Sequence, residues 1–278
     1  MPSKHSRPTR TTSSCNILSA TLGALDRLDE EHEYGTRSLC LKDAVAREPA
    51  FDLSRVPVPP FDSADPRRNI IAFSLYGADP CYTEGAILNA RAARFIYLGW
   101  TCRFYIDDSV PRPVVQALSG EGAQVMSVNG LPSATYGTLW RFLVANDDEV
   151  SRYIIRDADS VVNIRESVAV DEWLQSNRHF HLMRDHYDHS ELVLAGMWGG
   201  VRGALPALVP AIRTWLANAR QVPGKTTTRY FCANVCGRRF AKASSPTTVS
   251  SRSVRPATSH PLADCHPAFG SAAMGARC

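Results

Sequence analysis

The chain has 278 residues, of which 44% are hydrophobic and 21% are charged, and its formal net charge is +4. This length and composition leave room for one α/β domain with appendages, or for two small domains, around a sizeable hydrophobic core. The basic residues form no dense stripe, which argues against nucleic-acid binding, and no run of about 18 apolar residues predicts a transmembrane helix.

Residues 1–68 are predominantly polar, and the prolines between residues 57 and 66 predict an extended linker. A short amphipathic helix is predicted around residues 17–31, and we expect the rest of this segment to be largely disordered. Because the basic, Ser/Thr-rich N-terminus runs directly into acidic residues, it makes a poor signal peptide. A cytoplasmic location is therefore the default expectation.

Residues 69–225 alternate between strand-like and helix-like stretches. Apolar runs predict strands at residues 69–75, 103–106, 123–128, 153–155 and 180–183, with a further apolar segment at residues 192–198. Helices are predicted from Thr83 to Leu98, after Pro111, at residues 139–144 and 208–216, and around Val170, Trp173 and Leu174. This alternation predicts an α/β fold with a mainly parallel sheet and helices on both faces.

Asp157 and Asp159 lie one residue apart, directly after the strand predicted at residues 153–155. In α/β sheets, ligands bind beyond the carboxyl ends of the strands. Two carboxylates at one strand end repel each other unless a positive charge compensates them, and a divalent cation does so while also binding substrate phosphates. The pair therefore predicts a Mn²⁺ or Mg²⁺ site, and the alternative is a solvated turn that caps a helix.

The stretch from Leu139 to Ser160 resembles the helix, strand and Asp-x-Asp motif of GT-A-fold glycosyltransferases, in particular glycogenin-like enzymes. Five blocks in the same order resemble one bacterial group of such proteins. They are Phe73-Ser74-Leu75-Tyr76-Gly77, Tyr105-Ile106-Asp107-Asp108-Ser109, Arg156-Asp157-Ala158-Asp159-Ser160, Met183-Arg184-Asp185-His186 and Gly196-Met197-Trp198-Gly199. The resemblance implies a GT-A-type, Rossmann-like domain over residues 69–225. Such a domain would bind a nucleotide-diphosphate sugar and, with a divalent cation, transfer the sugar to an unknown glycan or other acceptor.

The resemblance also implies roles for residues at the ends of the first two strands. Ser74 and Tyr76 would line the nucleotide pocket. Asp107 and Asp108 end the second predicted strand and would contact the base or the ribose. Capping of the turn is an equal alternative for both aspartates.

Two arginines would act beside the metal ligands Asp157 and Asp159. An arginine on the helix before the Asp-x-Asp motif commonly approaches the donor diphosphate in these enzymes, and Arg141 is the matching residue. Arg156 would add positive charge at the same place. An ordinary ion pair is the alternative for Arg141.

The last two blocks would lie near the donor sugar. Asp185 or His186 would position sugar hydroxyl groups or assist proton transfer, and they stand as the candidate catalytic residues. Gly196 would allow close backbone approach, and the ring of Trp198 would offer a platform for the sugar. A structural histidine and a buried core tryptophan are the alternatives.

Two other functions compete with glycosyl transfer. Haloacid-dehalogenase-like phosphatases also place an Asp-x-Asp motif after a strand, but that motif is usually followed by Gly-Thr and needs a downstream lysine. Here Ser160-Val161 follow, and only Lys225 and Lys242 lie beyond. The second alternative is a catalytically defective protein that binds a nucleotide sugar without transferring it.

Residues 226–278 differ in composition from the rest of the chain. They contain a single acidic residue, Asp264, a single leucine, Leu262, and no isoleucine. Such a segment cannot bury enough apolar area to offset its ordering entropy, so we expect disorder. The group with the five blocks continues with an Asp-Gln-led helix and a His-Asp-Ser element. Reading residues 227–250 in a shifted frame is compatible with both, so we interpret the tail as a frameshift that leaves the fold incomplete at its C-terminal end.

Overall fold

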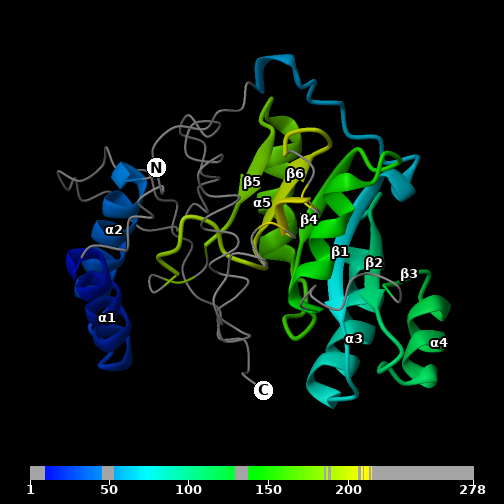
Figure 1. Ribbon diagram of the computed structural model, residues 1–278, viewed down its shortest axis with the longest axis horizontal. Helices are drawn as coiled ribbons and strands as arrows, with labels where there is room; N and C mark the ends of the chain where they lie inside the picture. Colours follow the sequence, from blue (N-terminus) through cyan, green and yellow to red (C-terminus); the bar gives the residue numbers. More distant parts are fainter. Residues whose placement is uncertain are drawn as a thin grey trace.

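The structure is a computed structural model, shown in Figure 1. It describes residues 10–45, 53–128, 137–184, 186, 189–205, 208, 210–212 and 214. The tail at residues 226–278 lies outside the described residues, as do Asp185 and parts of the helix predicted at residues 208–216. The expectations of disorder and of a frameshift in that tail remain predictions.

Six strands of the described chain form one sheet in the order β3-β2-β1-β4-β6-β5. The strands are β1 Asn69–Leu75, β2 Thr101–Ile106, β3 Gln124–Ser127, β4 Arg152–Ile155, β5 Phe180–Leu182 and β6 Trp198–Val201. β1 pairs in parallel with β2 and β4, and β2 pairs in parallel with β3. β6 runs antiparallel to both of its neighbours, β4 and β5. The mainly parallel sheet predicted from the sequence is therefore confirmed.

Strand β6 fits between β4 and β5 because glycines stand where side chains would collide. A Cβ on Gly199 would lie 2.6 Å from the backbone oxygen of Tyr153 and 2.6 Å from Cγ2 of Ile154. A Cβ on Gly200 would lie 2.8 Å from the hydroxyl oxygen of Tyr153. Glycine carries no strand signal of its own, so the sequence predicts only an apolar segment at residues 192–198.

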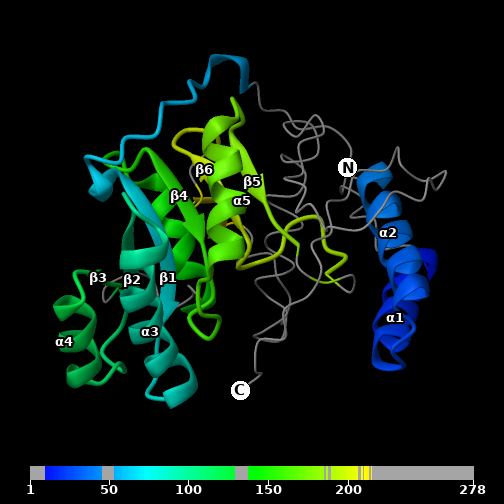
Figure 2. The ribbon, with the colours of Figure 1, turned by 180° about the vertical axis from the view of Figure 1, so that it is seen from behind.

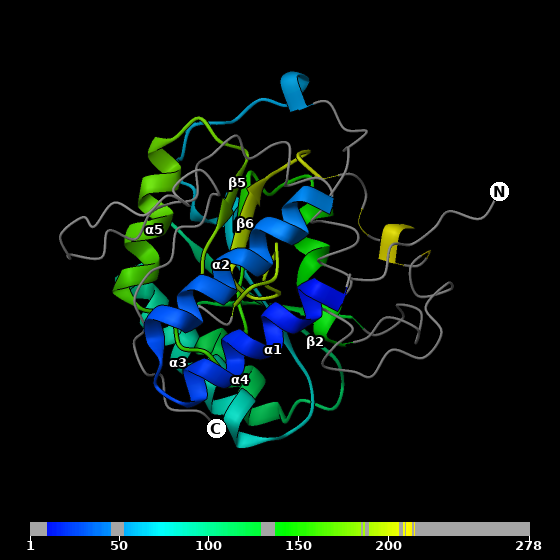
Figure 3. The same ribbon diagram turned by 90° about the vertical axis from the view of Figure 1, so that its left-hand side faces the viewer.

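Helical elements cover both faces of the sheet, as predicted. They are α3 Pro80–Ile96, α4 Arg112–Gly120, the 3₁₀ segment η3 Gly137–Asn146 and α5 Ile164–Gln175. Figure 3 shows α5 and η3 on opposite sides of the sheet, and Figure 2 shows α3 and α5 on the face turned toward the viewer. Helix α3 begins earlier than predicted. The carboxylate of Asp79 accepts a hydrogen bond from the backbone N of Cys81, whereas Thr83 lies inside the helix.

Part of the extension predicted to be disordered is helical. Helices α1 Arg10–Ala24 and α2 Leu28–Val45 form an N-terminal hairpin, whose turn includes Asp26 with a φ of 59° (Figure 1). The helix predicted at residues 17–31 is thus two helices. The residues buried in this hairpin include Cys15, Leu22, Leu39, Ser19 and Ser38. Because small polar side chains share the interface between the two helices, the spacing of apolar residues alone underestimates the length and number of the helices. No helix of the described chain is long and apolar enough to cross a membrane.

Candidate functional site

A cavity of about 420 Å³ opens beyond the carboxyl ends of β1 and β4. Along the chain, β1, β2 and β3 extend the sheet in one direction, and β4 then pairs on the other side of β1. This reversal of strand order is the position at which open α/β sheets bind their ligands. The end of β1 and the residues that follow β1, β4 and β5 line the cavity together with residues of α3, η3 and α5. They include Ser74, Tyr76, Tyr82, Thr138, Arg141, Arg156, Asp157, Asp159, Ser160, Glu166, His189, Gly196 and Met197.

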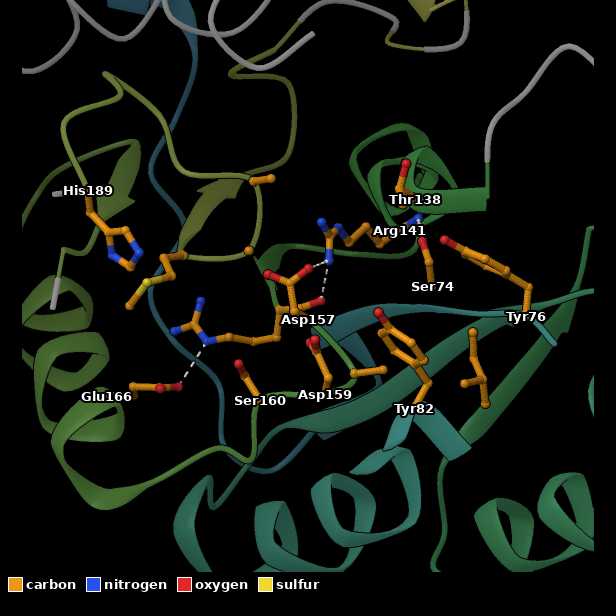
Figure 4. A pocket seen from close by; sticks show the side chains of 16 residues that line it. Ser74, Tyr76, Tyr82, Thr138, Arg141, Asp157, Asp159, Ser160, Glu166 and His189 are labelled. Carbon is orange, nitrogen blue, oxygen red and sulfur yellow. Dashed lines mark hydrogen bonds and ion pairs between the residues drawn. The ribbon is translucent and has the colours of Figure 1, made fainter. Parts of the chain in front are cut away.

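The two predicted metal ligands lie together at the centre of this cavity. Figure 4 shows the carboxylates of Asp157 and Asp159 close to each other, with Arg141 reaching Asp157 from the opposite side. The loop that carries them follows β4, and the backbone N of Ser160 donates to the carbonyl oxygen of Asp157 at 3.3 Å. The side chain of Asp157 remains 45% exposed, which leaves room for a ligand.

Arg141 connects three parts of the site. Its backbone N donates to Oγ of Ser74 at 3.0 Å, which links η3 to β1. Its side-chain NH1 donates to the carbonyl oxygen of Arg156 at 2.9 Å and to Oδ1 of Asp157. The side chain is only 5% exposed, so this ion pair is shielded from water on the arginine side. Arg141 therefore belongs to the site, where it already holds one of the carboxylates.

Helix α3 packs against the loop after β4 that carries Asp157 and Asp159, which we call the aspartate loop, and holds it in place. Asn89 is fully buried, and its Nδ2 donates to the carbonyl oxygen of Ala158 at 3.2 Å and to that of Gly85 at 2.9 Å. Its Oδ1 accepts from the backbone N of Val162 at 2.9 Å. A Cβ on Gly85 would lie 2.4 Å from the carbonyl oxygen of Ala158, so the helix can approach only with glycine there. Asn89 could not be predicted from the sequence, because a lone asparagine inside a helix carries no signal of its partners.

Replacing Asn89 with alanine should destabilise the protein measurably. Asn89→Ala would leave the buried groups of Ala158 and Val162 without these partners, and we expect a loss of about 2–3 kcal/mol in the free energy of unfolding. Denaturant unfolding measures this loss. Asn163→Ala is the matched control, because Asn163 is exposed. It caps α5, which is worth about 1 kcal/mol, and its Nδ2 donates to Oε1 of Glu166 at 2.9 Å. If Asn89→Ala lowered the free energy of unfolding no more than the control does, Asn89 would not hold the aspartate loop in place.

Arg156 lines the cavity, but its guanidinium group serves the fold. Its Nε donates to Oε2 of Glu166 on α5 at 3.2 Å, and the side chain is 3% exposed. The phenol of Tyr97 lies beside it, and burial raises the pKa of Tyr97 to about 12. On its other side, burial and then the positive charge of Arg156 lower the pKa of His181 to about 3. Because it is buried and paired with Glu166, Arg156 is poorly placed to reach a diphosphate.

The charges that line the cavity favour a cation. Among the described residues they are three carboxylates, of Asp157, Asp159 and Glu166, and two guanidinium groups, of Arg141 and Arg156. Counting histidine as neutral, the formal charge of the lining is −1. Both guanidinium groups already form ion pairs, with Asp157 and with Glu166. An anionic ligand would be repelled by this lining unless a cation entered with it.

The residues present fit a divalent cation that shares its ligands with a substrate. Oδ1 of Asp157 accepts from Arg141, while Asp159 contributes a second carboxylate to the same cavity. Within the described ranges, no group of three His, Cys, Asp or Glu side chains is placed to hold a metal ion. Mg²⁺ and Mn²⁺ suit a site of one or two carboxylates, because water and substrate phosphates complete their shells.

Aromatic and hydroxyl side chains border the cavity near β1, and two of them, Tyr82 and Thr138, were not predicted from the sequence. Tyr76, which was predicted, is 45% exposed and meets the ring of Trp140 edge-on at 5.7 Å. Tyr82 and Thr138 join it on the same flank, with His189 on the opposite one (Figure 4). Partial burial, the largest cause, raises the pKa of Tyr76, so its phenol stays protonated at neutral pH.

Asp107 and Asp108 do not line the cavity. Asp107 accepts hydrogen bonds from the backbone N of Ser109 at 3.1 Å and from its hydroxyl group, and Oγ of Ser109 accepts from the backbone N of Gly77 at 2.6 Å. These contacts make Asp107 the cap of the turn after β2 and join that turn to the one after β1. For Asp107, the structure therefore supports the capping alternative.

Trp198 and His186 also lie away from their predicted positions. Trp198 has no exposed surface, and its ring packs 5.8 Å from the rings of both Phe142 and Tyr153. The prediction that Trp198 is a platform for a sugar is thus wrong, because its ring lies in the core. Gly196, two residues earlier in the chain, lines the cavity. Nδ1 of His186 lies 3.2 Å from Oε1 of Glu31 on the N-terminal hairpin. Asp185 lies outside the described residues.

Comparisons with known proteins give fold-level likeness at most. No protein-family model matches the chain, and a search of curated proteins finds no match. A mannosyltransferase from Pyrobaculum calidifontis, solved in complex with GDP-Man and Mn²⁺, has 11% identity over 68% of this chain, with a TM-score of 0.39. This chain covers 57% of the length of that protein.

Two further solved structures are similar to this chain at the same level. Mannosyl-3-phosphoglycerate synthase from Rubrobacter xylanophilus has 14% identity over 69% of this chain and 81% of its own length, with a TM-score of 0.39. Glucosyl-3-phosphoglycerate synthase from M. tuberculosis has 10% identity over 72% of this chain and 88% of its own length, also with a TM-score of 0.39. Likeness this distant assigns neither activity nor substrate to this chain, so its α/β architecture rests on the sheet itself.

Proposed function

We propose that the chain is a GT-A-type glycosyltransferase that uses a divalent cation and a nucleotide-diphosphate sugar. The observation that carries this proposal is the cavity at the reversal of strand order, whose lining includes Asp157 and Asp159 and has a formal charge of −1. We infer the reaction class from the resemblance of the motifs, and we infer the need for a cation from the acidic lining of the cavity. The acceptor, a glycan or another molecule, is not specified by these features.

The cavity lining divides into a nucleotide side and a sugar side. Ser74, near the end of β1, and Tyr76, directly after it, would bind the nucleoside, and Tyr82 adds a second ring near them. Asp157 and Asp159 would hold the cation, which would neutralise charge on the departing diphosphate. Arg141 holds Asp157 in place and adds positive charge at the same point.

The sugar would lie between the aspartates and the opposite wall of the cavity. Gly196 and Met197 border this side, and His189 lies there as well. Transfer breaks the bond between the anomeric carbon and the diphosphate oxygen and forms one to an acceptor hydroxyl, whose proton needs an acceptor base. His189 replaces His186 as the candidate imidazole, because it lines the cavity and His186 does not.

The phosphatase alternative finds no support in the cavity. That chemistry needs a lysine beside the nucleophilic aspartate, and among the described residues that line the cavity there is none. Oδ1 of Asp157 is also held by Arg141. The defective binding protein stays as one outcome of the experiments below, since it shares the same site.

Nucleoside diphosphates should stabilise the protein only in the presence of Mn²⁺ or Mg²⁺. A ligand at about 100 times its Kd adds about 2.7 kcal/mol to the free energy of unfolding, which a thermal-shift screen of GDP, UDP, ADP, CDP and dTDP detects. Arg141→Ala should weaken binding by roughly ten- to a hundredfold, because a charge-assisted contact is lost. Arg91→Ala is the control, since Arg91 forms an exposed ion pair with Glu121.

Absence of any stabilisation by these nucleotides with either metal would refute the proposal. Binding of a nucleotide sugar with neither transfer nor hydrolysis would identify the defective protein instead.

A further inference from the structure

One wall of the cavity is held from outside by the N-terminal hairpin. We call residues 189–197 the wall segment, because His189, Ala195, Gly196 and Met197 in it line the cavity. Figure 1 shows the chain between β5 and β6 extending from the sheet toward the hairpin, and Lys42 of α2 contacts it there. The wall segment is thus placed between the hairpin and the site.

Lys42 of α2 makes the principal contacts to the wall segment. Its Nζ donates to the carbonyl oxygen of Ser190 at 2.7 Å and lies 2.9 Å from Oε1 of Glu191. The lysine side chain is only 14% exposed, so the ion pair is partly shielded from solvent. Asn16 of α1 accepts a hydrogen bond from Oγ of Ser190 at 2.8 Å. Both helices of the hairpin therefore bind Ser190, and α2 also binds Glu191.

A second contact lies next to the first. Glu31 of α2 is fully buried, and its Oε1 is 3.2 Å from Nδ1 of His186. A buried carboxylate is costly unless hydrogen bonds or a positive charge compensate it, and the imidazole of His186 lies within ion-pair distance of this one. A Cβ on Gly23 would lie 2.7 Å from Oε1 of Glu31, so α1 leaves this space open with glycine.

A displacement of the wall segment would directly affect the position of the Asp157 carboxylate. Arg184 is buried, and its NH2 donates to the carbonyl oxygens of Glu191 at 2.9 Å and Leu192 at 2.6 Å, which closes the segment at its base. Further along, Gly196 lies so close to Asp157 that a Cβ there would be 1.9 Å from Oδ2. The position of Gly196 thus limits the position of the Asp157 carboxylate.

We propose that the N-terminal hairpin positions the wall segment, with Lys42 as the chief positioning residue, and thereby sets the ligand affinity of the cavity. Docking of the hairpin rests on the contacts of Lys42, Asn16 and Glu31 alone, whereas its effect on ligand affinity rests on the proposed function. The sequence separation of 148 residues between Lys42 and Ser190 makes this a tertiary contact rather than a local one.

Hydrogen exchange measured by mass spectrometry tests the docking without any ligand. In Lys42→Ala, amides of the wall segment should exchange roughly tenfold faster, because hydrogen bonds to a charged group are lost. Peptides covering β1 and β4 should exchange as in the wild type. Lys42→Arg should restore slow exchange, since it keeps a cationic donor. Arg27→Ala is the matched control, because its exposed ion pair with Glu30 lies within the hairpin.

Three outcomes of the exchange experiment would overturn the proposal. These are unchanged exchange of the wall segment, equal acceleration in β1 and β4, or the same acceleration in Arg27→Ala. A separate titration with GDP or UDP and Mn²⁺ should show about tenfold weaker binding by Lys42→Ala, restored in Lys42→Arg. Equal affinity of Lys42→Ala and wild type would overturn the effect on the cavity. If the wild type binds neither nucleotide, the proposed function fails, while the exchange data still decide the docking.

Discussion

The double substitution Asp157→Asn and Asp159→Asn should abolish Mn²⁺-dependent nucleotide binding while the chain stays folded. Each charge-assisted ligand is worth about 1.5–3 kcal/mol, so loss of both should weaken binding by about a thousandfold. Calorimetric titration with the nucleoside diphosphate that stabilises the wild type measures the effect. Undiminished Mn²⁺-dependent binding by this variant would rule out the aspartates as metal ligands.

The chain offers a matched control for this variant in its other aspartate pair. Asp107 and Asp108 also follow a strand, but Asp107 caps the turn, and neither residue lines the cavity. Asp107→Asn with Asp108→Asn should therefore leave nucleotide affinity unchanged. Equal loss of affinity in both double variants would point to a general effect of charge removal.

The single variants should also differ in stability without metal. Asp157 pairs with the nearly buried Arg141, so Asp157→Asn removes the charge that compensates this guanidinium group and should lower the free energy of unfolding. The sequence alone shows only the repulsion between the two aspartates, from which we would expect the double substitution to raise stability without metal. Asp159→Asn should be the less destabilising of the two.

Gly196→Ala should weaken Mn²⁺-dependent nucleotide binding by about a hundredfold. The added Cβ would lie 1.9 Å from Oδ2 of Asp157 and 3.2 Å from its backbone N. The carboxylate would have to rotate away, and one metal contact worth about 1.5–3 kcal/mol would be lost or distorted. Overpacking adds a stability cost of about 1–3 kcal/mol. Nucleotide titration and denaturant unfolding measure the two effects.

Gly120→Ala is the control for the glycine substitution. Nothing lies within 4 Å of a Cβ at position 120, and no unusual φ is required there, so we expect wild-type affinity and stability close to that of the wild type. Normal nucleotide affinity in Gly196→Ala would show that the wall segment yields and that Gly196 does not limit Asp157.

The centre of the site could be predicted because it depends on local pattern. A run of β-branched residues ending in Asp157 and Asp159 places both at a strand end, and the alternation of elements brings that end beside the turn after β1. Ser74, Tyr76, Arg141 and Gly196 line the same cavity. Their roles as ligand contacts remain predictions that the substitutions above test.

The remaining features depend on partners far away in sequence. The antiparallel pairing of β6 with β4 places Trp198 opposite Ile155, and the ring of Trp198 is fully buried in the core. Gly196 precedes the strand and lines the cavity. The ion pair of Arg156 requires Glu166 on another element. Asn89 acquires its importance only when α3 packs under the aspartate loop.

The long-range docking of the N-terminal hairpin has a consequence for the order of folding. Helices α1 and α2 are joined by a short turn and can form early during synthesis, because their contacts are local. Their contacts with the wall segment span 148 to 174 residues, so they must wait until the chain beyond Glu191 has been made. Closing so long a loop is entropically costly until the intervening sheet has formed. We therefore expect the cavity wall to become native after the sheet, when a hairpin made near the start of synthesis meets a segment made much later.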